Sequence, residues 1–299
     1  MAPDRVLSAV TAVAVLSAGA MLLALPAPIA APIERTVYVT VVDNKGAFVP
    51  DITAADLVVK EGGKERAIVK IEPSVEPLNI ALLIEQGLTG DSYLRNGIFQ
   101  FLQRVNTRAR TALFVVNRRA VMVQDYTSDL QAQVAAINGF GLTRPTQDEN
   151  LTEAVFETAR NLQRIETGRR VIVALALENA QESAMSADQA LDELQQSGVM
   201  FYAATMAGGR PVATTAAAAL DESSRGKILG DGTKQTGGRR QESLRTAGFP
   251  AVLTQFADEL LHQYAVTYVL PDGVKKDSRL SVSTKRKGVS IRAASRIPK

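Results

Sequence analysis

Residues 77–92, PLNIALLIEQGLTGDS, decide the fold of this chain. Leu78 to Ile84 form an apolar run that only Asn79 interrupts, with Pro77 before it and a polar, glycine-containing loop after it. Such a run is typical of a central strand covered by helices on both faces. In an open α/β sheet, a strand followed by a short polar loop and a helix places ligands at the carboxyl end of the strand. The stretch therefore predicts this kind of sheet and the place of its site.

Patterns of strand and helix type alternate from residue 78 to residue 204, which predicts a doubly wound, mostly parallel α/β sheet with flanking helices. The expected strands are 78–84, 111–117, 120–123, 171–177 and 199–204. The expected helices are 93–105, 130–138 with Ser128 as its cap, 151–164, and 187–197 between Ser186 and Gly198. Residues 206–245, rich in Ala, Thr, Gly and Arg, interrupt the alternation and predict a flexible excursion. A helix at 249–262 and a last sheet strand at 264–270 are expected to follow.

Small β elements are expected at both ends of this domain. Residues 37–41 alternate between Val and polar side chains, and residues 57–71 predict a hairpin around Gly62-Gly63. Residues 280–284 and 289–293 alternate around Lys287-Gly288, which predicts a basic C-terminal hairpin. The predicted domains are 1–31, a signal peptide or signal anchor; 32–76, a small β unit; 77–270, the α/β domain; and 271–299, the hairpin and tail.

The N-terminus predicts export. Arg5 precedes an uncharged stretch from Val6 to Leu25 and then PAPIAAP, the arrangement of a secretory signal. The stretch is also just long enough to span a bilayer, so an uncleaved anchor in the inner membrane is the alternative. We expect the rest of the chain to be periplasmic or extracellular. The absence of Cys excludes a lipid-modified N-terminal Cys and thiolate chemistry.

Positive charge is concentrated at the C-terminus. The chain has a net charge of +3, and residues 271–299 hold nine Lys and Arg against two Asp, so the remainder is about −4. We interpret these basic residues as the outward side chains of an edge hairpin, where Lys and Arg discourage aggregation. No aromatic residue interleaves with them as a stacking platform would require, so nucleic-acid binding is not expected.

The order of elements and the loop after residue 84 resemble the von Willebrand factor A-type domain. In that family the first strand ends in Asp-x-Ser-x-Ser, which holds a divalent cation; here the five positions are Glu85, Gln86, Gly87, Leu88 and Thr89. TVYVTVVDNKGAFVPDITAADLVVKEGGK, Thr236-Gly237-Gly238 and ELLHQYAVTYVLPDG before a basic hairpin are similar to the exported acidobacterial VWFA-related proteins, over about residues 31–297. The resemblance implies an A-type domain with β elements from both ends.

The resemblance implies a metal-ion-dependent adhesion site with altered ligands. The candidates are Glu85 and Thr89 in the first loop, Thr143, Thr146 or Glu149 before the third helix, and Glu178 after the fourth strand. Mg²⁺ requires near-ideal octahedral oxygen geometry, and a lengthened carboxylate and a lost hydroxyl disfavour it. We therefore predict a degenerate, metal-free site without a cofactor; a Ca²⁺ or Mg²⁺ site is the alternative. Without a cation, Glu85 is expected to cap the next helix or to accept backbone N–H groups.

Enzyme activity is not expected. Glu85 and Glu178 are a conceivable carboxylate pair, but the sequence supplies neither a nucleophile nor an oxyanion hole with them. No GxSxG, Walker, HExxH or dinucleotide motif occurs. His262, the only histidine, is expected at the end of the last helix, and Tyr264 and Tyr268 in the core and rim of the last strand.

We therefore predict a non-enzymatic interaction module of the bacterial cell envelope. Its protein partner would contact the strand-end face of residues 85–92, 140–149 and 178–185. The candidate contact residues are Gln86, Asp91, Arg144 and Glu178. Two alternatives remain: an adhesin that holds Ca²⁺ through Glu85, Thr89 and Glu178, and a structural part of an envelope assembly that docks through edge strands.

Overall fold

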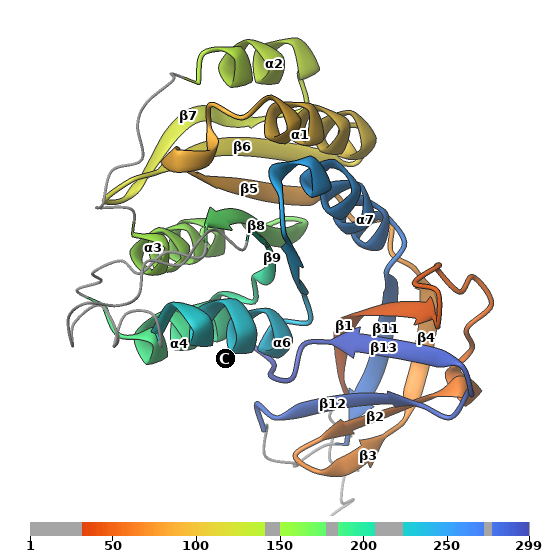
Figure 1. Cartoon of the computed structure of the whole chain (residues 1–299). Helices are drawn as coiled ribbons and strands as arrows, with labels where there is room; N and C mark the ends of the chain where they lie inside the picture. Colours follow the sequence, from red (N-terminus) through yellow and green to blue (C-terminus); the bar gives the residue numbers. More distant parts are fainter. Residues whose placement is uncertain (1–31, 141–149, 178–184, 207–223, 272–276, 299) are drawn as a thin grey trace, which may run out of the picture. The chain divides into compact units, whose positions relative to one another are not determined.

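A six-stranded sheet forms the centre of the protein, which a computed structural model describes at residues 32–140, 150–177, 185–206, 224–271 and 277–298 (Figure 1). The strand order is β10-β9-β8-β5-β6-β7, and all neighbours are parallel except β6 and β7. The strands are β5 (Leu78–Glu85), β6 (Ala109–Val116), β7 (Ala120–Thr127), β8 (Arg169–Leu177), β9 (Met200–Met206) and β10 (Arg240–Ser243). The predicted α/β sheet is confirmed.

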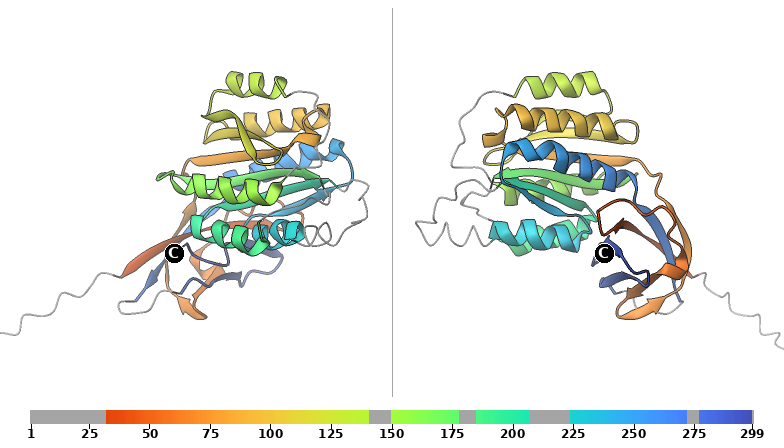
Figure 2. Two further views of the ribbon diagram at one scale, coloured as in Figure 1. Left: turned by 90° about the vertical axis from the view of Figure 1, so that its left-hand side faces the viewer. Right: turned by 45° about the vertical axis from the view of Figure 1, so that its right-hand side comes forward.

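Helices cover both faces of this sheet because its central strands are apolar on both sides (Figure 2). Along β5, Ile80, Leu82 and Ile84 belong to one buried cluster, while Ala81 and Leu83 belong to the other. The first cluster includes side chains of α1 (Ser92–Val105), α2 (Leu130–Asn138) and α7 (Phe249–Leu261). The second includes side chains of α3 (Leu151–Gln163) and α4 (Ala187–Ser197).

Local capping signals explain where several helices begin and end. The Ser186 hydroxyl accepts a hydrogen bond from the Gln189 amide at 3.3 Å, and Gly198 ends α4 with φ = 65°, both as predicted. The N-cap of α2 is Asp129 rather than the predicted Ser128. The Asp129 carboxylate accepts from two backbone amides of the first turn, whereas a hydroxyl at residue 128 is one position too early.

Two smaller sheets form a separate β layer from both ends of the chain. One has the order β13-β1-β11-β4 and the other β12-β2-β3. Their strands are β1 (Ile33–Asp43), β2 (Leu57–Glu61), β3 (Lys64–Arg66), β4 (Ile68–Pro73), β11 (Tyr264–Leu270), β12 (Leu280–Thr284) and β13 (Val289–Ala293). At the short helix η1 (Ala54–Asp56), the Asp56 carboxylate accepts hydrogen bonds from the backbone amide of Thr53 at 2.9 Å and from its hydroxyl at 2.8 Å.

The structure corrects two expectations about the C-terminal strands. β11, expected as the last strand of the α/β sheet, pairs instead with β1 and β4. β12 and β13 lie at the predicted residues but do not form a hairpin ladder, because β12 pairs with β2 and β13 with β1. Their apolar side chains share one core between the two sheets, and each strand is an edge strand, as the basic composition suggested.

The predicted excursion at 206–245 is also corrected in its second half; residues 207–223 lie outside the described part. Residues 224–227 are helical, and η3 (Ile228–Gly232), α6 (Thr233–Gln235), β10 and η4 (Thr246–Gly248) follow. Ile228 and Leu229 are buried against the second helix layer. The Thr236 hydroxyl accepts from the Phe201 amide at 3.0 Å, which fixes this segment to β9.

No helix within the described ranges is long and apolar enough to cross a membrane. The predicted signal segment, 1–31, lies outside these ranges.

Candidate functional site

The strand-end loop after β5 begins at Glu85, the last residue of the strand. A short helical turn, η2 (Gln86–Leu88), follows at once, and Asp91 then caps α1 by accepting the Leu94 amide at 2.9 Å. The parallel strands β8 and β9 end at the same edge of the sheet. The structure therefore places Glu85 where the sequence predicted a ligand site.

Glu85 is engaged by a backbone amide and by an arginine. Its Oε2 accepts a hydrogen bond from the Leu177 amide at the end of β8, at 2.5 Å. Its Oε1 lies 2.5 Å from Nη2 of Arg225, and the same Nη2 donates to the Leu177 carbonyl. One guanidinium thus joins the carboxyl ends of two neighbouring strands to residues 224–227.

The pair is buried: the exposed fraction is 0% for Glu85 and 5% for Arg225. Removing a carboxylate and a guanidinium from water costs several kcal/mol per ion, and the protein recovers this through their attraction and their hydrogen bonds. The charge-assisted bonds to Leu177 supply part of that compensation. Two roles were expected of Glu85, to cap the next helix or to accept backbone N–H groups of the loop. It does not cap η2; it accepts a backbone N–H group, but from Leu177 at the end of β8 and not from the loop.

The described residues of this site do not fit a divalent cation. Both carboxylate oxygens of Glu85 face hydrogen-bond donors, one of them a full positive charge, and that environment repels a metal ion. The Thr89 hydroxyl is buried and donates to the Gln86 carbonyl at 2.8 Å. Within the described ranges, no group of three His, Asp or Glu side chains is close enough together to hold a metal.

The remaining predicted site residues divide into two groups. Gln86 and Asp91 are partly exposed on the loop, although the Asp91 carboxylate also caps α1. Five further candidates lie outside the described residues: Thr143, Arg144, Thr146, Glu149 and Glu178. The proposed carboxylate pair of Glu85 and Glu178 is therefore neither assembled nor excluded by the described residues.

Sequence reasoning missed two residues at this edge of the sheet. Arg225 lies in the predicted excursion, 140 positions from Glu85, and no local pattern connects the two. Tyr93, in the first turn of α1, has an exposed fraction of 56%. Its place beside the predicted loop face was readable from the sequence, but its orientation depended on which face of α1 packs inward.

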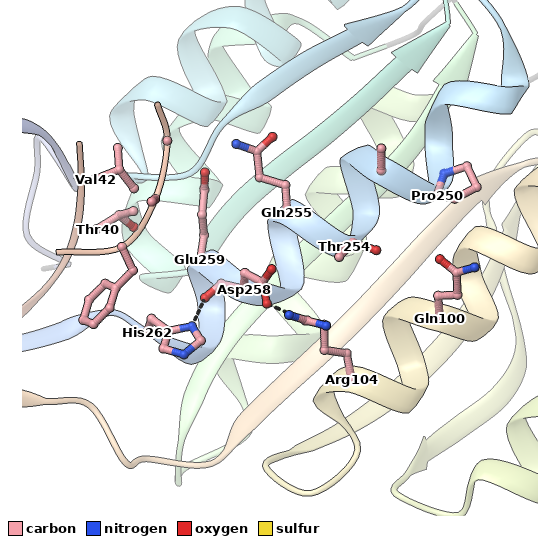
Figure 3. Close-up of a pocket in the computed structure, with 14 residues that line it drawn as sticks. Thr40, Val42, Gln100, Arg104, Pro250, Thr254, Gln255, Asp258, Glu259 and His262 are labelled. Carbon is pink, nitrogen blue, oxygen red and sulfur yellow. Dashed lines mark hydrogen bonds and ion pairs between the residues drawn. The ribbon is translucent and has the colours of Figure 1, made fainter. Parts of the chain in front are cut away.

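A separate groove of about 550 Å³ lies between α1, α7 and the turn after β1 (Figure 3). Arg104 and Asp258 form an ion pair across it. The His262 ring packs against Phe48 with centroids 5.1 Å apart, and its Nδ1 lies 2.7 Å from the Asp258 carbonyl oxygen. Glu259 is held by Arg239 at 2.8 Å and by Arg292. Each of these charged and aromatic groups is thus engaged within the chain, and among the described lining residues no Ser, Cys or Lys lies beside His262.

No protein-family model matches the sequence. No curated protein matches it either. Similar solved structures include a von Willebrand factor type A protein from Catenulispora acidiphila, with a TM-score of 0.46 and 9% identity over 89% of this chain and 74% of that one. An aerotolerance-related membrane protein from Bacteroides fragilis has a TM-score of 0.43 and 11% identity over 61% of this chain and 99% of that one.

Proximal thread matrix protein 1 of the mussel byssus, with a zinc-occupied MIDAS motif, has a TM-score of 0.47 and 14% identity over 69% of this chain and 50% of that one. With TM-scores below 0.5, these likenesses carry no argument about this chain by themselves. The strand order and the two helix layers of this protein agree with the fold that its sequence resemblance implied. The chain has an A-type fold.

Proposed function

We propose that this protein is an exported, non-enzymatic interaction module of the bacterial cell envelope, and that it binds a protein partner without a metal ion. The ion pair between Glu85 and Arg225 carries this proposal. In the A-type arrangement the carboxylate at this position serves a cation, whereas here both of its oxygens are used within the chain. Recognition then rests on the shape and side chains of the loop surface.

The described part of the proposed contact surface is residues 86–93, here called the loop surface. Tyr93 is its most exposed large side chain, and Gln86 and Asp91 lie beside it with partial exposure. Tyrosine is enriched among the residues that dominate interface energies, because it buries a large rigid ring and keeps a polar end. We infer that Tyr93 anchors the partner and that Gln86 contributes polar contacts.

The test is capture of envelope proteins by the purified protein, with EDTA or with Mg²⁺ and Ca²⁺. We expect the same partner in both conditions, and its loss with Tyr93→Ala. Leu244→Ala is the matched control. Leu244 is an exposed apolar residue just after the edge strand β10, which β9 and β8 separate from β5. Capture that EDTA abolishes would contradict the metal-free proposal. Capture that survives Tyr93→Ala and Gln86→Ala would instead favour docking through the edge strands β12 and β13.

A further inference from the structure

Arg225 occupies the position that an ion would need in order to bind Glu85. We propose that its guanidinium is a built-in cation, and that the surrounding pocket is a guanidinium-binding site formed by Glu85 and the Leu177 peptide group. This inference rests on the metal-free part of the proposed function and names the group that replaces the metal. It makes the conformation of the strand-end loop depend on residue 225 rather than on divalent ions.

Burial of the site favours a guanidinium over an ammonium. Nη2 of Arg225 reaches both Glu85 Oε1 and the Leu177 carbonyl, while the Leu177 amide donates to the other oxygen of Glu85. The Leu177 peptide group therefore has both its donor and its acceptor in the site. A guanidinium is more weakly hydrated than an ammonium, so less free energy is lost when it is buried, and it is the better cation for a buried carboxylate.

The segment that carries Arg225 is fixed independently of the ion pair. Ile228 and Leu229 are buried in the second helix layer, one turn after Arg225. Further along, the Thr233 hydroxyl donates to the Leu229 carbonyl at 2.8 Å, and Thr236 holds the Phe201 amide. The apolar anchors and the β9 contact hold the segment through contacts that do not involve the ion pair. Removing the Arg225 side chain alone is therefore expected to leave an open site beside Glu85 that lacks its cation, and not a collapsed site.

The test is chemical rescue of Arg225→Ala by methylguanidinium, read as the midpoint of thermal unfolding by circular dichroism. We expect the variant to melt below the wild type. About 20 mM methylguanidinium should then raise its midpoint, relative to the effect on wild type, by about 3–5 °C if this concentration is tenfold above the dissociation constant. Equal concentrations of MgCl₂ or CaCl₂ should give no comparable rise, and neither should methylguanidinium with Glu85→Gln/Arg225→Ala, which lacks the anionic partner.

A folded Arg225→Ala protein that methylguanidinium does not stabilise would overturn the inference, as would equal rescue of the double variant. Arg225→Lys tests the same geometry if the alanine variant does not fold. We expect the lysine variant to fold with a lowered midpoint, because burying a strongly hydrated ammonium costs more than burying a guanidinium; a midpoint equal to that of wild type would refute the inference. Either failure leaves the proposed role of the loop surface standing, since partner capture is measured on proteins that keep Glu85 and Arg225. Sensitivity of that capture to EDTA would overturn the proposed function instead.

Discussion

A double-mutant cycle on Glu85 and Arg225 tests whether the two residues act as one unit. Arg225→Met keeps most of the side-chain volume but leaves the Glu85 carboxylate, which is fully buried, without its cation. Breaking a buried pair in this way costs about 3–5 kcal/mol. Glu85→Gln leaves the arginine without its anion and is expected to cost a similar amount by the same reasoning.

The double variant, Glu85→Gln/Arg225→Met, buries no net charge at either position. Replacing both members of a buried pair by neutral groups of similar volume is often close to neutral. We therefore expect the double variant to be more stable than either single variant, with a coupling free energy of at least about 2 kcal/mol. Unfolding in urea, followed by far-ultraviolet circular dichroism, measures all four proteins.

Single-variant costs that add to within about 0.5 kcal/mol in the double variant would refute this reasoning, because additivity indicates independent sites. The matched control is the pair of Arg286 and Asp51, whose side chains are 35% and 66% exposed at a separation of 2.9 Å. Solvent screens such a pair, so the cycle of Arg286→Met and Asp51→Asn should show a far smaller coupling than the buried pair.

Two further predictions concern the close backbone contact at Gly238 and the titration of buried tyrosines. A Cβ at Gly238 would lie 1.9 Å from the Phe201 carbonyl oxygen, so Gly238→Ala should destabilise the protein by at least about 3 kcal/mol. The control is Gly226→Ala, where nothing lies within 4 Å of the added Cβ, and this variant should be neutral or more stable by about 0.5–1 kcal/mol. Equal midpoints of urea unfolding for the two variants would contradict the close approach of Gly238 to Phe201. Burial, reinforced in three cases by a neighbouring Glu and in the fourth by a neighbouring Asp, raises the pKa of four tyrosines well above their usual range, so the folded protein keeps protons that the unfolded chain releases near pH 10. The contribution of these tyrosines to the free energy of unfolding is complete below about pH 10 and falls as the pH rises further. Absorbance of tyrosinate at 295 nm should therefore increase together with the loss of circular dichroism. Full tyrosinate absorbance from a protein that is still folded would contradict this prediction. These residues are Tyr38, Tyr126, Tyr202 and Tyr268.

The central sheet was predictable because its strands carry strong local patterns. β5 is apolar at nearly every position and buried at every position, which is typical of a strand between two helix layers. β11 carries a different pattern: Tyr264, Val266, Tyr268 and Leu270 are buried and the residues between them are half-exposed. That alternation belongs to a sheet with one solvated face, but it is an alternation of burial and not of residue type. Ala265 and Val269 are apolar, so the sequence did not mark β11 as lying outside the α/β sheet.

The candidate site was only half predictable. The position of Glu85 followed from the strand and loop pattern, and the altered ligand set was the basis for the prediction of a metal-free site. Arg225 did not follow, because its partner is distant in sequence and its own neighbourhood, rich in small and polar residues, resembles a loop. β10 was missed for a related reason: Arg240–Ser243 is a short, polar edge strand without the apolar run that marks the strands beside it.

Calorimetric titration of Ca²⁺, Mg²⁺ and Mn²⁺ into the wild-type protein is the most direct test of the metal-free site. With the Arg225 guanidinium on the Glu85 carboxylate, we predict no saturable heat from any of the three ions. Glu85→Ala serves as the control for binding elsewhere on the protein. Saturable binding by the wild type that this substitution abolishes would show that Glu85 serves a metal ion, and would contradict the central claim.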